Sequence, residues 1–194
     1  MTLEPVSAHG AVSGRRLTAC DHVVQLGDSL TVRHAVHLRR AYRRIGVREP
    51  LILAGEGRGI TFKSGGDTET GLQAAEAIRK VATERSWKLC WVVALGTNDA
   101  AWLDTRERRA SSIGQLQRVI GSEPALWVDV WVFNNSDRPR YGQERSTAWN
   151  ALLAARQRAR PGFHVLRWSE SARVHPEWYL TDRIHYRVAG AKAR

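Results

Sequence analysis

Four side chains in three separate segments have the types needed for nucleophilic catalysis. Ser29 lies in a Gly-Asp-Ser-Leu segment that follows an apolar run, and Asn98 lies in a Gly-Thr-Asn-Asp segment that follows a second apolar run. Near the C-terminus, Asp182 comes three residues before His185. A histidine oriented by a carboxylate can remove the proton of a serine hydroxyl, and a carboxamide can donate to a developing oxyanion. An Asp-Ser pair alone is also a common helix cap, so the prediction depends on the whole set.

The spacing of apolar residues predicts alternating strands and helices around these candidates. Strands are predicted at 22–26, 51–54, 89–95, 126–133 and 163–166, and helices after Ser29, from Thr68, and at 108–120 and 147–158. Such alternation predicts a parallel sheet built from βαβ units. Ser29 and Asn98 follow the first and third strands, at the sheet edge where ligands bind in open α/β folds.

Taken in order, the three segments resemble the conserved blocks of the SGNH, or GDSL, hydrolase family. The resemblance spans most of the chain, from Gly27 to His185. It implies an α/β fold, a flavodoxin-like three-layer sandwich whose five-stranded parallel sheet has helices on both faces. It also implies a serine esterase without cofactor or metal, in which Ser29, Asp182 and His185 form a catalytic triad through an acyl-enzyme. Asp99 is expected to brace its loop.

The resemblance further implies an oxyanion-hole glycine shortly after the second strand. Its N–H would act with the Ser29 N–H and the Asn98 side chain. Gly57 is our choice, because it follows the strand soonest with a residue between it and the next glycine, while Gly59 and Gly66 stay open. A phosphate-binding loop is excluded because no Gly-Lys-Ser/Thr follows these glycines.

The sequence predicts the substrate class in less detail than the catalytic residues. Trp102, Trp168 and Trp178 are expected in loops near the catalytic edge, where they would either line an acyl or sugar pocket or pack as core. No extended apolar cap segment is visible, which favours short acyl groups. The expected substrate is therefore a short-chain acyl or acetyl ester, or an O-acylated carbohydrate. Two alternatives stay open: transfer of the acyl group to a cell-envelope sugar, and a non-catalytic basic domain that binds nucleic acid.

The chain length and the net charge limit the domain organisation and the kinds of partner that we expect. The 194 residues predict an N-terminal arm at 1–20 and one domain at 21–194. The net charge is +11, but no Lys/Arg run with interleaved aromatic residues occurs, so nucleic acid is not expected as a partner. No apolar run reaches the ~18 residues of a membrane span, and no signal peptide is visible as the chain is written. We expect a monomer.

The two cysteines, Cys20 and Cys90, suggest a disulfide. In a flavodoxin-like order the first and third strands are neighbours, and the cysteines lie seven and six residues before Gly27 and Gly96. Adjacent strands are ~4.8 Å apart, within the reach of a disulfide. The bond would tie the arm to the sheet and favour an oxidising, extracytoplasmic compartment. The alternative is two buried thiols in a cytosolic protein.

Overall fold

The computed structural model describes residues 20–65 and 69–194 as a five-stranded sheet with helices on both faces. The strands are β1 (His22–Gly27), β2 (Leu51–Ala54), β3 (Leu89–Ala94), β4 (Ala125–Val128) and β5 (Phe163–Leu166). All neighbouring pairs are parallel, and the spatial order is β2-β1-β3-β4-β5. This is the flavodoxin-like order, so the predicted fold class is confirmed.

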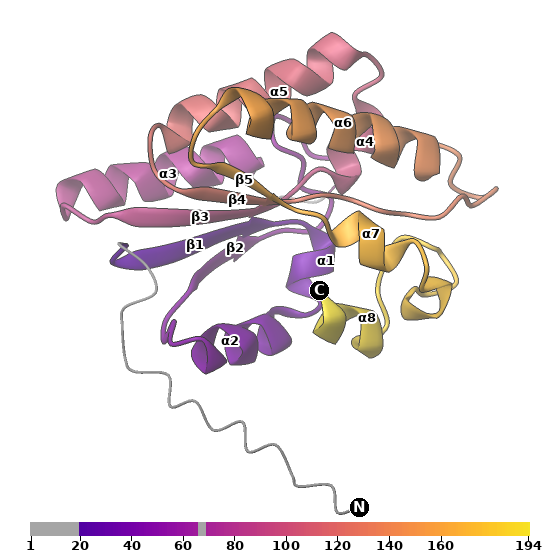
Figure 1. The fold of residues 1–194 in the computed structure, drawn as a ribbon, viewed down its shortest axis with the longest axis horizontal. Helices are drawn as coiled ribbons and strands as arrows, with labels where there is room; N and C mark the ends of the chain where they lie inside the picture. Colours follow the sequence, from indigo (N-terminus) through magenta and orange to yellow (C-terminus); the bar gives the residue numbers. More distant parts are fainter. Residues whose placement is uncertain (1–19, 66–68) are drawn as a thin grey trace, which may run out of the picture.

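The helices cover the two faces of the sheet unequally. Figure 1 shows α3 (Gly71–Glu84), α5 (Arg106–Ile120) and α6 (Gln143–Ala159) together on one face. The opposite face carries α2 (Ala35–Arg44) and the short α8 (Val188–Ala193). The buried core lies mainly between the sheet and the three long helices, and it contains Trp91, Trp127 and Trp149. Three of the eight tryptophans are therefore wholly structural.

Local sequence explains where the long helices begin. Thr70 caps α3 by accepting from the Gln73 N–H, and the Gln73 side chain accepts in return from the Thr70 N–H. This reciprocal pair satisfies two backbone donors that a helix start leaves free. The cap was predicted at Thr68, which lies outside the described residues, and the helix itself begins at Gly71. Helix α6, in contrast, begins earlier than predicted, at Gln143 instead of Thr147.

The fourth strand is shorter than predicted, because residues 129–133 leave the sheet after Val128. Their backbone groups find partners elsewhere. The Asn150 side chain accepts from the Val130 N–H at 2.9 Å and donates to the Val130 carbonyl at 2.8 Å. Farther on, the Phe133 N–H donates to the Arg183 carbonyl. A side chain of α6 and the C-terminal segment thus replace a neighbouring strand, and an apolar run cannot reveal that.

The three tryptophans predicted in loops lie instead in short helical segments that the sequence did not predict. Trp102 ends α4 (Thr97–Trp102), Trp168 begins α7 (Trp168–Ala172), and Trp178 ends a 3₁₀ turn. Trp168 is buried and stacks on Trp178, with ring centroids 5.5 Å apart. These two tryptophans are packing residues, whereas Trp102 is 40% exposed.

Several arginines act as structural donors to backbone carbonyls. Arg58 is buried and donates to the carbonyls of Leu53 and Glu69. Arg109 is also buried and donates to the carbonyls of Leu103 and Ala100. A guanidinium is suited to this role because it offers five N–H donors in a fixed plane. Part of the high arginine content therefore serves the fold.

Cys20 and Cys90 form the predicted disulfide, with Cα atoms 5.6 Å apart. The seven- and six-residue spacings predicted that the two cysteines lie at nearly the same level along the neighbouring strands. This was wrong, because Cys90 pairs in register with Val23, three residues after Cys20. The chain bends back before β1, where the Asp21 N–H donates to the Lys88 carbonyl at 2.8 Å, and this bend brings the cysteines together. Apart from Cys20, the predicted arm lies outside the described residues. No helix in the described ranges is long and apolar enough to span a bilayer.

Candidate active site

Ser29 lies in the sharp turn between β1 and the four-residue helix α1 (Ser29–Val32). Asp28 caps this helix, and its carboxylate accepts from the Leu30 N–H at 3.0 Å. The turn needs Gly27, because a Cβ at that position would overlap the Thr31 side chain. As the first residue of a helix, Ser29 has an N–H without an intrahelical acceptor. The hydroxyl thus lies beside a free backbone donor.

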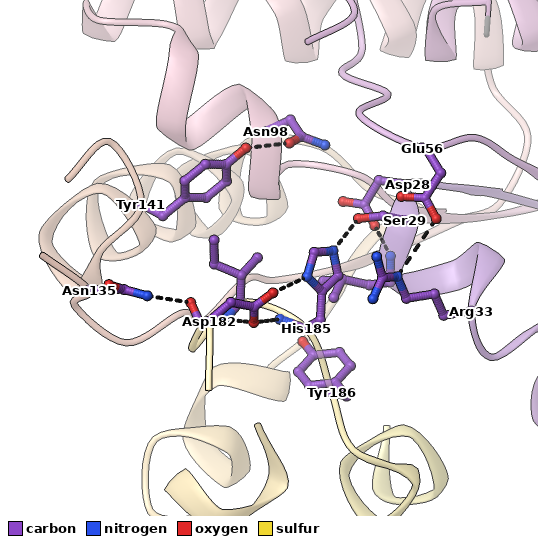
Figure 2. A network of polar contacts seen from close by, with 12 residues as sticks. Asp28, Ser29, Arg33, Glu56, Asn98, Asn135, Tyr141, Asp182, His185 and Tyr186 are labelled. Carbon is purple, nitrogen blue, oxygen red and sulfur yellow. Dashed lines mark hydrogen bonds and ion pairs between the residues drawn. The ribbon is translucent and has the colours of Figure 1, made fainter. Parts of the chain in front are cut away.

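The C-terminal segment places a histidine against this serine, from 156 residues away in the chain. The His185 Nε2 lies 2.9 Å from the Ser29 Oγ, and the His185 Nδ1 lies 2.6 Å from the Asp182 Oδ2 (Figure 2). An ionised carboxylate only accepts, so Nδ1 carries the proton and Nε2 is left to accept from the serine hydroxyl. The three side chains are aligned for proton transfer from Ser29 to His185.

The turn that carries Asp182 and His185 is held by backbone bonds and by a neighbouring loop. The Asp182 Oδ1 accepts from the N–H groups of Ile184 and His185, at 3.0 and 2.9 Å. Arg183 between them has a φ of 58°, a left-handed conformation uncommon for a residue with a side chain. The Asn135 side chain donates to the Asp182 carbonyl at 3.1 Å. The acid and base are therefore fixed as one unit.

The charge state of Asp182 follows from these bonds. Partial burial raises the pKa of the Asp182 carboxyl, but the hydrogen bonds from the His185 side chain and from the two N–H groups outweigh it. The net result is a pKa below the usual value, so the group is ionised at neutral pH. A nearby buried carboxyl behaves differently, because burial raises the pKa of Asp28.

Asn98 comes from the turn after β3, the neighbour of β1 in the sheet. The turn uses Gly96 in a left-handed conformation, with φ 130°, and the Trp149 ring occupies the space of a side chain there. The buried Asn98 amide donates from Nδ2 to the Arg58 carbonyl at 3.0 Å and accepts at Oδ1 from the Tyr141 hydroxyl at 2.9 Å. One of its two amide N–H groups is left for a substrate.

The Asp99 side chain points into the protein interior and stabilises this turn by hydrogen bonds. Its carboxylate accepts from the Ile60 N–H, at 3.0 and 3.2 Å, and from the Ser112 hydroxyl at 3.1 Å. The side chain is fully buried, and burial raises its pKa to about 7. Asp99 thus links the Asn98 turn to the loop after β2 and to α5.

No family model matches the sequence, and no curated protein matches it either. Solved structures do match. A lipase/acylhydrolase from Enterococcus faecalis superposes with a TM-score of 0.62 at 18% identity, over 89% of this chain and 90% of that one. AlinE4, an SGNH-hydrolase family esterase, gives 0.56 at 16% identity over 89% of each chain. A carbohydrate acetylesterase from Sinorhizobium meliloti, Est24, gives 0.55 at 15% identity over 88% of this chain and 93% of that one.

The chain has the SGNH-hydrolase fold. Within this fold, the three sequence segments meet at the carboxyl ends of the strands, where Ser29, Asn98 and the Asp182–His185 pair follow β1, β3 and the last strand, β5. Among the described residues, no group of three or more His, Cys, Asp and Glu side chains is placed to hold a metal ion.

The three candidate glycines of the SGNH-fold site differ in their surroundings. Gly57 has a φ of 65° in the turn after β2, and its carbonyl accepts from the Ser64 N–H at 2.9 Å. The N–H of Gly59 already donates to the Phe62 carbonyl at 2.9 Å, so it is not free for an oxyanion. Gly66 lies outside the described residues. Gly57 stays our candidate, and its left-handed conformation also gives it a structural reason to be glycine.

An open cavity of about 720 Å³ borders the triad of the SGNH-fold site on the Asp182 side. Its wall comes from the loop after residue 133, from Thr181 and Asp182, and from Trp102. The Arg140 guanidinium lies over the Trp102 ring, 4.7 Å from its centroid. On the other side of Ser29, an Arg33–Glu56 ion pair of 3.7 Å borders the site (Figure 2). The site thus has a cavity on the Asp182 side and a charged pair on the other side.

Sequence reasoning did not single out three residues that contact the predicted site residues. Tyr141 and Arg58 bond the Asn98 amide from opposite sides, and Asn135 bonds the Asp182 backbone. Asn135 and Tyr141 lie between β4 and α6, in a segment rich in polar residues at the carboxyl ends of the strands. Nothing in the sequence shows which of its residues turn inward, so this signal was too coarse to identify them.

Proposed function

We propose that this protein is a serine esterase that hydrolyses carboxylic esters through an acyl-enzyme on Ser29. The observation that carries the proposal is the continuous chain from the Ser29 Oγ through His185 to Asp182, with links of 2.9 and 2.6 Å. The fold shared with esterases supports the same reading. A non-catalytic role gives no reason to align a hydroxyl, an imidazole and an ionised carboxylate in this way.

The aligned groups define a two-step reaction. The Ser29 Oγ attacks the ester carbonyl while the His185 Nε2 takes the hydroxyl proton, and the imidazolium then protonates the departing alkoxide. Water next attacks the acyl-enzyme with His185 as the base, which releases the acid and restores the serine. Throughout, Asp182 holds the proton-bearing Nδ1 and stabilises the imidazolium.

The oxyanion would be held by three donors. The Ser29 N–H is free because it begins a helix, and the Asn98 amide keeps one N–H beyond its bond to the Arg58 carbonyl. We assign the third donor to the Gly57 N–H. Loss of one such donor lowers turnover by ~10² or more in comparable sites.

For the substrate we propose a short-chain acyl ester, with O-acetylated carbohydrate as the natural form. The cavity beside Asp182 has a mixed polar and aromatic wall. Its Trp102 ring is 40% exposed although the Arg140 guanidinium lies over it, and the exposed part offers aromatic surface to a sugar. Est24, which shares the fold, is a carbohydrate acetylesterase. The cavity is open to solvent, so water can reach the acyl-enzyme, and this favours hydrolysis over transfer to a second sugar.

The proposal is tested by a substrate series and by covalent trapping. p-Nitrophenyl acetate, butyrate and octanoate, together with an O-acetylated polysaccharide, are offered to the purified chain. We expect turnover to fall from acetate to octanoate, and acetate to be released from the polysaccharide. A phosphonate ester should add to Ser29 alone, as located by peptide mass spectrometry. No turnover of any ester, or labelling elsewhere, would contradict the proposal, and a preference for octanoate would contradict the short-chain part.

A further inference from the structure

The orientation of the Asn98 amide decides whether it can stabilise an oxyanion at all. With Nδ2 toward the reacting oxygen it donates a hydrogen bond, whereas a rotation of 180° would present the Oδ1 lone pairs and repel the oxyanion. The two ends of an amide have nearly the same shape, so packing alone does not distinguish them. Only the hydrogen-bond partners of Asn98 can hold the productive orientation.

A directional chain of hydrogen bonds supplies those partners. The Trp102 Nε1 can only donate, and it lies 3.3 Å from the Tyr141 hydroxyl oxygen. The tyrosine hydroxyl then directs its own hydrogen to the Asn98 Oδ1, at 2.9 Å. At the other end of the amide, the Arg58 carbonyl can only accept, and it lies 3.0 Å from the Asn98 Nδ2. Every donor and acceptor in the chain points the same way.

The surroundings of Tyr141 keep this chain intact. Burial raises the pKa of the Tyr141 hydroxyl, so it stays protonated and able to donate at neutral and mildly alkaline pH. The loop that carries it is also anchored at Asn135, which bonds the Asp182 carbonyl. Figure 2 shows Tyr141 on the Oδ1 side of Asn98, with the amide nitrogen turned away from the ring.

We propose that Tyr141 is a positioning residue that holds the Asn98 amide with its free N–H toward the oxyanion. The inference rests on the proposed esterase function. Tyr141 itself touches no reacting atom, so its hydroxyl acts only through Asn98. Without the hydroxyl the Oδ1 loses its donor, and only the bond from Nδ2 to the Arg58 carbonyl is left to hold the productive orientation. The effect should appear in kcat and not in KM, because the oxyanion exists only beyond the ground state.

The test is a double-mutant cycle on p-nitrophenyl acetate with Tyr141→Phe, Asn98→Ala and the combined variant. Tyr141→Phe keeps the ring and removes the hydroxyl, and we expect kcat to fall about 10-fold with KM unchanged, as for one neutral hydrogen bond. In the Asn98→Ala background the same substitution should change kcat less than about twofold, because its target is gone. A merely structural role would lower kcat equally in both backgrounds.

The matched control is Tyr42→Phe, which removes a hydroxyl that donates to the Gln25 side chain at 2.6 Å, away from Ser29. It should leave kcat unchanged. Additive effects in the cycle, or a kcat for Tyr141→Phe equal to that of the unsubstituted chain, would overturn the inference while leaving the esterase intact. An unsubstituted chain without ester turnover would instead overturn the proposed function, and the inference with it.

Discussion

The two ends of the strands are built for different purposes. At the carboxyl ends, buried polar groups such as Asp28, Asn98 and Asp99 surround Ser29, whose Oγ lies 2.9 Å from the His185 Nε2. At the amino ends, a disulfide joins Cys20 to Cys90. There too, Glu123 accepts from the Trp91 indole at 2.7 Å and pairs with a guanidinium at 2.8 Å. One end carries the proposed chemistry and the other ties the chain together.

This difference predicts which property each substitution should change. A polar group placed for reaction contributes little to stability, because its partners are incomplete until the substrate binds. A covalent or fully paired group at the amino ends stabilises the fold without meeting the substrate. Asp99 tests the division, because it lies at the catalytic end but is fully buried and bonded to Ile60 and Ser112.

The largest expected effect is on turnover. Ser29→Ala removes the proposed nucleophile, and ester hydrolysis should fall by ~10⁴ or more, as for other triad losses. The melting temperature should stay within a few degrees, since one hydroxyl at a turn is lost. Initial rates with p-nitrophenyl acetate test the loss of turnover, and a thermal melt tests the unchanged melting temperature. Turnover within about tenfold of the unsubstituted chain would remove Ser29 from the nucleophile role.

A substitution at the amino ends of the strands should instead lower the stability and leave turnover nearly unchanged. Cys20→Ser combined with Cys90→Ser opens a loop of sequence separation 70. The chain-entropy relation gives a loss of ~4 kcal/mol in the free energy of unfolding. Urea unfolding should show this loss, while kcat for ester hydrolysis below the melting range stays within about twofold. A large fall in kcat with unchanged stability would break the division between the two ends.

A pH-dependent change in stability is expected from Asp99. The pKa of its carboxyl is about 7 in the fold, above the ~3.9 of an unfolded chain, so the folded state binds more protons between these values. This contribution is complete below pH ~4 and is lost as the pH rises through about 7. Asp99→Asn keeps an acceptor for the Ile60 N–H and cannot ionise. The stability of the native chain should therefore fall relative to Asp99→Asn between about pH 4 and 7. A difference in melting temperature between the two chains that stays constant over this range would contradict the prediction.

The smallest effect concerns Asp182, whose pKa is lowered in the fold. A carboxyl with a depressed pKa stabilises the fold above its unfolded value of ~3.9, and this contribution disappears as the pH falls through the folded value. Because Asp182 is partly exposed, we expect about 1 kcal/mol or less. Melting temperatures of the native chain and Asp182→Asn should converge between pH 5 and 3. A gap that widens toward acid pH would show that the carboxylate is not stabilised as described.

Local patterns in the sequence were enough to predict the sheet and the residues for the proposed chemistry. Apolar runs bounded by glycine turns located β1, β2, β3 and β5 closely, because a buried parallel strand needs a continuous apolar segment. The order of strands and helices implied that Ser29 and Asn98 lie at the same edge. The disulfide was also predicted, although its residues are farther apart in register than the sequence suggested.

Only the tertiary structure decided how the loops reach these residues. The end of β4, the inward turn of Asn135 and the bond from Tyr141 to Asn98 all depend on contacts between segments far apart in the chain. Asn150 illustrates the reason, since its side chain replaces a strand partner for Val130 from 20 residues away. A side chain that satisfies a distant backbone group leaves no periodic signal, because the geometry exists only after the elements have packed.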